Sequence, residues 1–370
     1  MSETKTRILF VRPTLGYGGA DRITVNLLRD FDRSRYTCDL VLMRKEGEFA
    51  GDIPADVRII ETRSANALLM FRALIPLIGS GAYDVVYSTS GGTNVPLMLA
   101  TFLSAQKPVT VLSERSALFA PGKNRLKQRF FHWMKKLTYP AADHITAVSA
   151  GLQKELLQEL NIDPGKLRLV NNPVINDELL GAREEKLQNI VFQQQEPVIL
   201  AAGRFIPLKD YETLFKAFQL VNTKRKSRLY LLGKGPLEKK LRTLAITLGL
   251  ADRIHFGGFD KNPFRYMSRC SVFVLSSRHE GMPGVLIQAM ACGAPCVATN
   301  CPTGPDEIIK DGENGFLVPV GDAAAMADRM LRILNDPLLR EKFSKAATAS
   351  LARFEHRAAI ESYFNFLHSS

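Results

Sequence analysis

The chain has 370 residues and a formal net charge of +12, with 46% hydrophobic and 23% charged residues. This length is sufficient for two domains with separate cores. No apolar stretch reaches the roughly 18 uninterrupted residues of a membrane span, because Arg72 and Pro76 interrupt the best candidate. The first seven residues, MSETKTR, also lack the apolar region of a secretory signal. We therefore expect a cytoplasmic protein.

Five cysteines, an odd number, are typical of a reducing compartment in which cysteines act as small apolar residues. Cys292, Cys296 and Cys301 are close in sequence, but their intervals differ from the CxxC spacing of zinc sites. His144 and His255 each lie beside an expected strand without a partner at metal-ligand spacing, and we interpret both as structural. We expect neither a metal site nor a tightly bound cofactor.

The first half of the chain alternates expected strands and helices, which predicts a parallel sheet. From Arg7 an apolar strand leads into a glycine loop and a helical pattern (RILFVRPTLGYGGADRITVNLL). Gly16, Gly18 and Gly19 would let the backbone approach a ligand at this first strand-to-helix turn, although one glycine-rich turn is weak evidence. Further strands are expected at 38–43, 84–87, 109–112 and 145–148.

Glu114 and Arg115 follow the expected strand at 109–112, so both should lie at its carboxyl end. In an open α/β sheet this is the edge where ligands bind. Glu114 is a candidate for contacting the donor or the acceptor of a reaction. The alternative is a structural salt bridge.

A basic segment interleaved with aromatic residues spans 115–137, and no acidic residue occurs from 115 to 142. Such a segment could bind an anionic membrane surface or a lipid-diphosphate acceptor. Alternatively it is a domain helix whose core stripe consists of Phe130, Trp133, Met134 and Leu137. A nucleic-acid partner is not expected, because no recognition motif accompanies the charge.

In the second half, the polar stretch 177–196 is expected to be an interdomain linker, and a buried strand follows at 198–202. Gly203 ends this strand, and a helix should begin near Asp210. Arg204 and Lys209 lie on the loop between them, where two cations could clamp a diphosphate. Taken without a neighbouring motif, they could equally be two surface cations.

A second strand, loop and helix occur at 272–299. Glu280 lies on the loop after the strand at 272–275, and the helical pattern begins at Val285. The amides around Gly284 to Leu286 should then be unpaired at a helix N-terminus, which attracts phosphate oxygens. The alternative is a capped turn with a solvated glutamate. Together, the two loops would place a carboxylate, two cations and a helix N-terminus along one rim, as suits a nucleotide diphosphate.

These motifs resemble those of the retaining GT-B glycosyltransferases of family 4, also described as glycosyl transferases group 1. That family has a G-R-x-x-x-x-K loop and an E-G-x-P stretch followed by A-M-A-C-G-x-P. This chain matches with Gly203, Arg204 and Lys209, and with Glu280, Gly281 and Pro283. Further segments resemble the family in the same order along the chain, at 16–22, 149–151, 171–173, 233–236, 255–259, 290–299 and 304–318.

The resemblance implies two Rossmann-like, doubly wound parallel-sheet domains facing a central cleft. Residues 1–180, with a C-terminal helix at about 354–370, would bind the acceptor, and residues 190–353 would bind the nucleotide sugar. Glu280, Arg204 and Lys209 would be catalytic. The implied donor-binding residues are Gly203, Gly233, Gly235, Phe259, Gly281, Met282, Pro283, Gly284, Val285, Leu286 and Gln288.

The chain departs from the family at Gln288, where a second glutamate is most common. By resemblance this position contacts the ribose hydroxyls of the donor. A glutamine can still accept a hydrogen bond through its carbonyl oxygen and donate one through its amide. We therefore expect the enzyme to be active.

By resemblance the enzyme would transfer a hexose-type sugar, with retention, from a nucleotide-diphosphate donor to a glycan or lipid-linked glycan. UDP is the commonest donor nucleotide among bacterial relatives that make surface polysaccharide, and no divalent metal is required if the cations stabilise the leaving group. The inner face of the cell membrane would be a suitable location. The alternatives are a sugar-nucleotide epimerase, a phosphorylase, or a non-catalytic protein that binds a membrane or polyanion.

Overall fold

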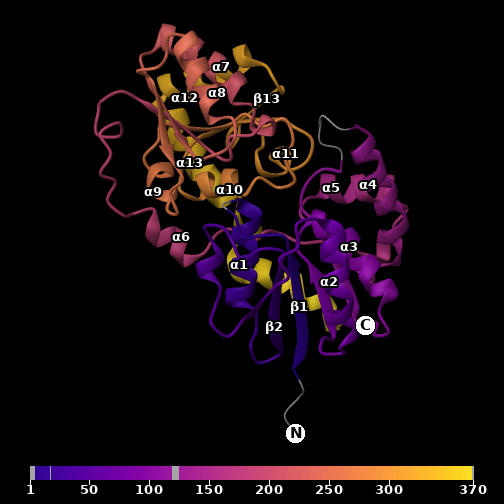
Figure 1. The fold of residues 1–370 in the computed structure, drawn as a ribbon. Coiled ribbons are helices and arrows are strands. Elements are labelled where there is room, and N and C mark those ends of the chain that lie inside the picture. The colour runs from indigo at the N-terminus through magenta and orange to yellow at the C-terminus, as the bar shows by residue number, and fades with distance from the viewer. Residues whose placement is uncertain (1–4, 17, 119–124, 369–370) are drawn as a thin grey trace. The chain divides into compact units, whose positions relative to one another are not determined.

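The computed structural model describes residues 5–16, 18–118 and 125–368. The chain forms two compact units, shown in Figure 1. Unit 1 consists of residues 1–173 together with 359–370, and unit 2 consists of residues 174–358. Each unit contains one parallel sheet with helices between its strands, as the alternation of strands and helices in the sequence predicts.

Unit 1 contains a seven-stranded parallel sheet with the order β3-β2-β1-β4-β5-β6-β7. The strands expected near residues 38, 84, 109 and 145 are confirmed as β2, β4, β5 and β6. The strand bounds are β1 Thr6–Arg12, β2 Tyr36–Leu42, β3 Arg58–Glu61, β4 Val85–Ser88, β5 Val109–Glu114, β6 His144–Ala147 and β7 Leu167–Leu169. The helices of this half are α1 Gly19–Asp30, α2 Ala67–Gly79, α3 Gly91–Leu103, α4 Arg125–Thr138 and α5 Ala150–Leu160.

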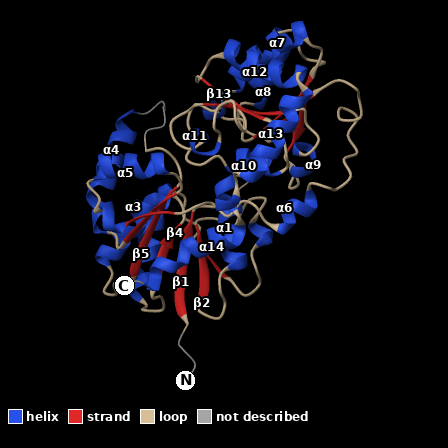
Figure 2. Cartoon of the chain, turned by 180° about the vertical axis from the view of Figure 1, so that it is seen from behind, coloured by secondary structure: helices blue, strands red, loops and turns tan. Residues whose placement is uncertain are grey.

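The last helix, α14 (His356–Phe364), brings the end of the chain onto the first sheet, and Figure 2 shows it beside β1 and β2. The Phe364 ring lies 5.1 Å from the Tyr36 ring and 6.4 Å from the Phe10 ring, measured between centroids. All three side chains are buried. Aromatic burial thus attaches the C-terminal residues to strands formed at the start of the chain.

Unit 2 contains a six-stranded parallel sheet with the order β10-β9-β8-β11-β12-β13. Its strands are β8 Val198–Ala202, β9 Arg228–Leu232, β10 Ile254–Gly258, β11 Val272–Leu275, β12 Cys296–Thr299 and β13 Phe316–Val318. The helices α7 and α10 begin where the sequence predicts, after Asp210 and near Val285. The helix bounds are α6 Asp177–Ala182, α7 Tyr211–Lys224, α8 Glu238–Thr247, α9 Phe264–Met267, α10 Gly284–Ala291, α11 Pro305–Ile308, α12 Ala323–Asn335 and α13 Pro337–Ala349.

The central strands of unit 2 are buried on both faces, which explains their continuous apolar sequences. On one face Ile199 and Val274 pack in a core with helices α7 and α12. The alternate residues Leu200 and Phe273 are also fully buried, on the opposite face. Because both faces are covered, polar side chains have room only at the two ends of these strands.

The stretch 177–196, which we expect to be an interdomain linker, begins with a helix and belongs to unit 2. Residues Asp177–Ala182 form α6, with the Asn176 side chain accepting a hydrogen bond from the Leu179 amide at 2.9 Å. Asp177 and Glu178 occupy the first turn, where negative charge is favourable. The helix was missed because a single buried leucine in six residues gives no visible apolar period.

The expectation of a core stripe on α4 is also wrong. Phe130, Trp133 and Leu137 are each more than half exposed, and only Met134 of the expected four is partly covered. The spacing of these residues is helical, but the apolar side of the helix faces outward.

Two loops at the carboxyl edge of the second sheet approach each other too closely for any side chain. The Gly203 amide donates to the Leu232 carbonyl at 2.9 Å, and the Gly233 amide donates to the Gly258 carbonyl at 2.7 Å. Gly233 has a φ of +137°, and a Cβ there would lie 2.0 Å from the Gly203 carbonyl oxygen. Glycine is therefore required at position 233 for the backbone itself.

We predict that Gly233→Ala lowers the free energy of unfolding by about 2 to 4 kcal/mol, because it adds backbone strain and a clash with a carbonyl. Gly181→Ala is the matched control, since Gly181 is in helix α6 of the same unit and has open space at its Cβ position. The control should be neutral or slightly stabilising. Urea unfolding followed by circular dichroism measures both; equal stability of the two variants would contradict the close approach.

Candidate active site

The sheet order of unit 2 places a topological switch point between β8 and β11. From β8 the chain proceeds outward to β9 and β10, whereas β11, β12 and β13 extend the sheet on the other side. In doubly wound sheets, ligands bind outside the carboxyl ends of the strands at such a point. The two loops singled out by sequence, at 203–210 and 276–284, follow these two strands and flank the switch point.

Lys209 and Glu280 meet across the switch point. The Lys209 Nζ atom lies 2.6 Å from Glu280 Oε1, and the two side chains are only 16% and 13% exposed. The Ser277 hydroxyl donates to the same carboxylate oxygen at 2.6 Å. Within the described part of the chain no donor contacts the other oxygen, Oε2. One carboxylate oxygen is thus fixed by two donors, while the second has no donor among the described residues.

Further hydrogen bonds hold the two loops together. The Ser276 hydroxyl donates to the Lys209 carbonyl at 2.7 Å, and the Arg278 amide donates to the Leu208 carbonyl at 2.8 Å. The hydroxyl of Thr303, on the loop after β12, donates to the carbonyl of Glu280. Backbone and hydroxyl contacts from the loops after three strands therefore fix the loop that carries the Glu280 carboxylate.

Sequence reasoning missed the positioning residues Ser277 and Thr303. Both are buried or partly buried polar residues at the ends of strands, and such residues need a hydrogen-bond partner. Hydroxyl residues on the loops after two strands, directly after β11 at Ser276–Ser277 and further along the loop after β12 at Thr303, are the signal that could have revealed them. Ser277 binds the Glu280 carboxylate and Thr303 binds the Glu280 carbonyl, and which acceptor each reaches depends on loop geometry that has no sequence pattern.

The N-terminus of α10 offers fewer free amides than expected. The Leu286 amide donates to the Pro283 carbonyl at 2.9 Å, so the expectation that it is unpaired is wrong. In the described residues, the amides of Gly284 and Val285 have no acceptor, in keeping with their position in the first helical turn. Two amides, rather than three, can bind an anion at this end.

The remaining candidates of unit 2 are distributed along the same edge. Arg204 follows β8 with an exposed side chain, and within the described residues it forms no ion pair with the Glu280 carboxylate. Gly235 lies against Phe205, where a Cβ would be 2.6 Å from its backbone nitrogen and oxygen. Phe259 follows β10 and Gln288 lies in α10, both partly buried. The structure therefore pairs only Lys209 with Glu280 directly, and positions the others on neighbouring loops.

In unit 1, a buried arginine supports the glycine loop. The Arg12 guanidinium binds the Asp21 carboxylate and donates to the Thr89 carbonyl at 3.0 Å. Asp21 in turn accepts a hydrogen bond from the Gly18 amide at 2.9 Å. Arg12 ends β1 and Thr89 follows β4, and these strands flank the switch point of the first sheet. The loop at Gly16, Gly18 and Gly19 is thus held by charge at the edge where ligands bind.

The geometry around Glu114 favours the salt-bridge alternative over a ligand contact. Its side chain is 2% exposed and accepts from Lys135 Nζ and from the Tyr139 hydroxyl, each at 2.7 Å. A Cβ at Gly91 would lie 2.4 Å from Glu114 Oε1, so the carboxylate has no room for a ligand on that side. Arg115 is partly buried beside the Tyr363 ring and points toward Asn172, 3.4 Å away.

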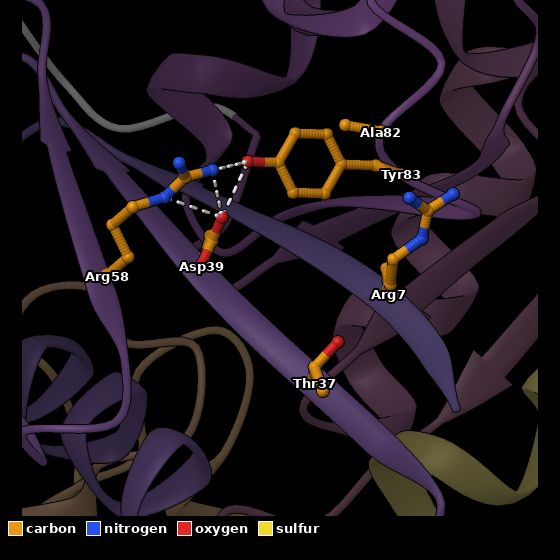
Figure 3. A pocket seen from close by; sticks show the side chains of 6 residues that line it. All are labelled: Arg7, Thr37, Asp39, Arg58, Ala82 and Tyr83. Atoms are coloured by element: carbon orange, nitrogen blue, oxygen red, sulfur yellow. Dashed lines mark hydrogen bonds and ion pairs between the residues drawn. The ribbon is translucent and has the colours of Figure 1, made fainter. Parts of the chain in front are cut away.

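One pocket, of about 230 Å³, lies elsewhere in unit 1, at the amino ends of β1, β2 and β3 (Figure 3). Asp39 accepts from Arg58 at 2.6 Å and from the Tyr83 hydroxyl at 2.7 Å. Burial, with the Asp39 charge, raises the pKa of Tyr83 to about 12. Arg58 is thus compensated by Asp39, and Arg7 lies 3.5 Å from the Asp84 carboxylate beside the pocket. Because the pocket lies at the amino edge of the first sheet and ligands bind at the carboxyl edge, it does not support a donor site. Its lining residues are Arg7, Thr37, Asp39, Arg58, Ala82 and Tyr83.

No metal centre is apparent in the described residues, where no group of three or more His, Cys, Asp or Glu side chains is placed to hold an ion. All five cysteines are buried and free. Burial raises the pKa of Cys292 and of Cys301 to about 12, so these thiols stay protonated at neutral pH. None of the helices in the described part of the chain is long and apolar enough to cross a membrane.

Comparison with known families assigns both halves of the chain. Residues 182–350 match the model of glycosyl transferases group 1, and residues 17–178 match that of glycosyltransferase family 4. A Campylobacter jejuni protein named N-acetylgalactosamine-N,N'-diacetylbacillosaminyl-diphospho-undecaprenol 4-alpha-N-acetylgalactosaminyltransferase is 27% identical, over 92% of this chain and 94% of its own. The lipopolysaccharide core biosynthesis glycosyltransferase LpsE of Rhizobium meliloti is 33% identical, over 47% of this chain and 50% of its own.

Solved structures share the fold over nearly the whole chain. The Anabaena protein HepE, in complex with UDP-glucose, aligns with a TM-score of 0.82 and 21% identity over 98% of this chain and 100% of its own. Sucrose-phosphate synthase of Thermosynechococcus elongatus aligns with a TM-score of 0.82 and 20% identity over 99% and 100%. At this identity the likeness establishes the fold, which is GT-B.

The chain therefore belongs to the group 1 and family 4 glycosyltransferases, as the motifs around Lys209 and Glu280 indicate. It is a transferase enzyme.

We predict that Lys135→Ala lowers the stability of unit 1 by about 3 kcal/mol, because it leaves the buried Glu114 carboxylate without its cation. Lys136→Ala is the control, since this exposed neighbour should change stability by no more than about 0.5 kcal/mol. Urea unfolding followed by circular dichroism gives the midpoints of both variants. Equal midpoints for the two variants would show that the buried pair does not stabilise the unit.

Proposed function

We propose that the enzyme transfers a hexose-type sugar from a nucleotide-diphosphate donor, with retention of anomeric configuration, to a glycan or lipid-linked glycan. The observation that carries this proposal is the contact between Lys209 and Glu280 at the switch point of unit 2. A cation for the diphosphate and a carboxylate for the sugar are held together at the edge where a doubly wound sheet binds its ligand.

In the proposed reaction, the bond between the anomeric carbon and the diphosphate oxygen breaks while the acceptor hydroxyl forms a new bond on the same face. The proton of that hydroxyl passes to the departing diphosphate. Lys209 and Arg204, with the amides of Gly284 and Val285, stabilise the negative charge that develops on the leaving group. Glu280, through its second oxygen Oε2, orients the sugar and stabilises positive charge near the anomeric carbon. These groups need no divalent metal and no tightly bound cofactor.

We further propose UDP as the donor nucleotide, with unit 2 as the donor-binding unit. HepE, whose fold this chain shares, was solved with UDP and with UDP-glucose. The donor loops of unit 2 would use Gly203, Gly233 and Gly235 for close backbone approach, Phe259 beside the base, and Gln288 at the ribose. Gly281, Met282, Pro283 and Leu286 shape the turn that carries Glu280.

The proposed acceptor is a lipid-linked glycan, bound mainly by unit 1 beside the glycine loop at Gly16, Gly18 and Gly19. The name of the Campylobacter jejuni relative specifies an undecaprenol-diphosphate acceptor. Such an acceptor is held in a bilayer, so we place the enzyme at the cytoplasmic face of the cell membrane. Arg115, close to Asn172, is the acceptor-side cation of this proposal.

The experiment that tests the donor is a thermal-shift panel of UDP, GDP and their sugars, with and without magnesium, on wild type and Arg204→Ala. Binding to the folded state alone raises the melting temperature in proportion to the logarithm of ligand concentration. We expect UDP and UDP-sugars to stabilise the wild type without magnesium, and to stabilise the variant less. Stabilisation by another nucleotide would correct the base, and no shift with any nucleotide would overturn the donor assignment.

We predict that Lys209→Ala lowers turnover by about two orders of magnitude, the scale of losing one preorganised charge stabiliser. Glu280 keeps its bond to Ser277, so unfolding free energy should fall by no more than about 2 kcal/mol. Lys226→Ala, a change at an exposed lysine of the same unit, is the control and should leave turnover unchanged. Full activity of the Lys209 variant would remove the diphosphate role.

We predict that Gln288→Glu keeps or tightens donor binding, because a carboxylate accepts two hydrogen bonds from the ribose hydroxyls where the amide accepts at one oxygen only. Titration calorimetry with UDP gives the affinity directly. A loss of affinity greater than about tenfold would show that position 288 has a different role.

A further inference from the structure

The exposed face of α4 is a feature that the transfer reaction does not explain. Leu126 is 79% exposed, Phe130 55%, Trp133 54% and Leu137 56%. At 100° per residue, these four side chains fall within about 60° of the helix circumference. The rings of Phe130 and Trp133 lie 6.0 Å apart, so the side chains are neighbours. We call these four residues the α4 stripe.

A buried charge pair fixes the helix with this stripe outward. Lys135 lies nearly opposite the stripe on the helix circumference and is paired with Glu114 inside unit 1. Thr138, on the same inner side, is buried as well. Rotating the apolar residues inward would remove Lys135 from the buried carboxylate. The outward position of the stripe is therefore built into the unit.

The border of the α4 stripe is basic. Arg129 and Lys136 are exposed and lie about two turns apart along the same edge of the stripe. No acidic residue occurs on α4, nor anywhere from 115 to 142. A helix with large apolar residues on one side and cations at its border is the form that lies in the headgroup region of an anionic bilayer.

We propose that the α4 stripe docks the enzyme on the surface of an anionic lipid bilayer, with Leu126, Phe130, Trp133 and Leu137 entering the headgroup layer and Arg129 and Lys136 binding lipid phosphates. A second copy of the chain is a poorer occupant, because two stripes face to face would bring the same cations together. This inference goes beyond the proposed transfer reaction: a lipid surface can bind whether or not the donor assignment holds.

The test uses Trp133 in the full-length protein, since it is the only tryptophan and belongs to the stripe. Vesicles of phosphatidylcholine with phosphatidylglycerol should shift its emission to shorter wavelength and sediment with the protein. Vesicles of phosphatidylcholine alone should do so far less, and binding should weaken between about 0.1 M and about 1 M salt. Emission that stays unchanged with anionic vesicles would overturn the proposal.

Two variants separate the contributions while keeping the reporter. Arg129→Gln with Lys136→Gln should weaken vesicle binding about 30-fold, from two lost cations. Phe130→Ser with Leu137→Ser should weaken it at least about tenfold and reduce the emission shift. Ile246→Ser with Leu338→Ser, at exposed apolar residues of unit 2, is the control and should bind like the wild type.

Two other outcomes would also overturn the proposal. If the control loses binding as much as the Phe130 and Leu137 variant, general surface hydrophobicity rather than the stripe carries the binding. If the emission of Trp133 shifts with protein concentration in the absence of lipid, the stripe is an interface between copies of the chain. Donor-induced thermal stabilisation, measured in parallel without vesicles, reports the transferase site separately.

Discussion

The ion pair between Lys209 and Glu280 joins the loop after β8 to the loop after β11. These two strands are neighbours, and the chain continues from them toward opposite edges of the sheet. Neither side chain is more than 16% exposed, so each charge depends on the other while no ligand is bound. A diphosphate that attracts the Lys209 ammonium would leave Glu280 held by Ser277 alone. Donor binding and the orientation of the carboxylate toward the sugar would then be linked through Glu280 Oε1, the oxygen that both Lys209 and Ser277 contact.

Close backbone approach makes this arrangement possible. Gly304 has a φ of +99°, and a Cβ there would lie 2.8 Å from the Gly281 carbonyl oxygen. The Thr303 bond to the backbone carbonyl of Glu280 is made just before this glycine, so the loop after β12 reaches the loop that carries the carboxylate only because no side chain intervenes. Gly304 thus contributes to the site by allowing its neighbour Thr303 to contact Glu280.

The sequence predicted at which edge of the sheet the site lies more readily than it predicted the hydrogen bonds at that edge. Lys209 and Glu280 each follow a recognisable buried strand, and the carboxyl ends of parallel strands meet at one edge, so their proximity could be expected. The bond from the Leu286 amide to the Pro283 carbonyl could not, because it depends on the turn angle at Pro283. Helix α6 was likewise hidden, since its caps rather than an apolar period define it.

The orientation of α4 shows why hydrophobic periodicity alone can misplace a helix face. The period of its apolar residues is helical whether they face the core or the solvent. What decides between the two is Glu114, a carboxylate buried at the end of β5 that requires a cation nearby. Lys135 supplies that cation, and with this residue fixed inward the four residues of the α4 stripe must face outward. A buried charge on a strand therefore determines which surface the enzyme presents to its surroundings.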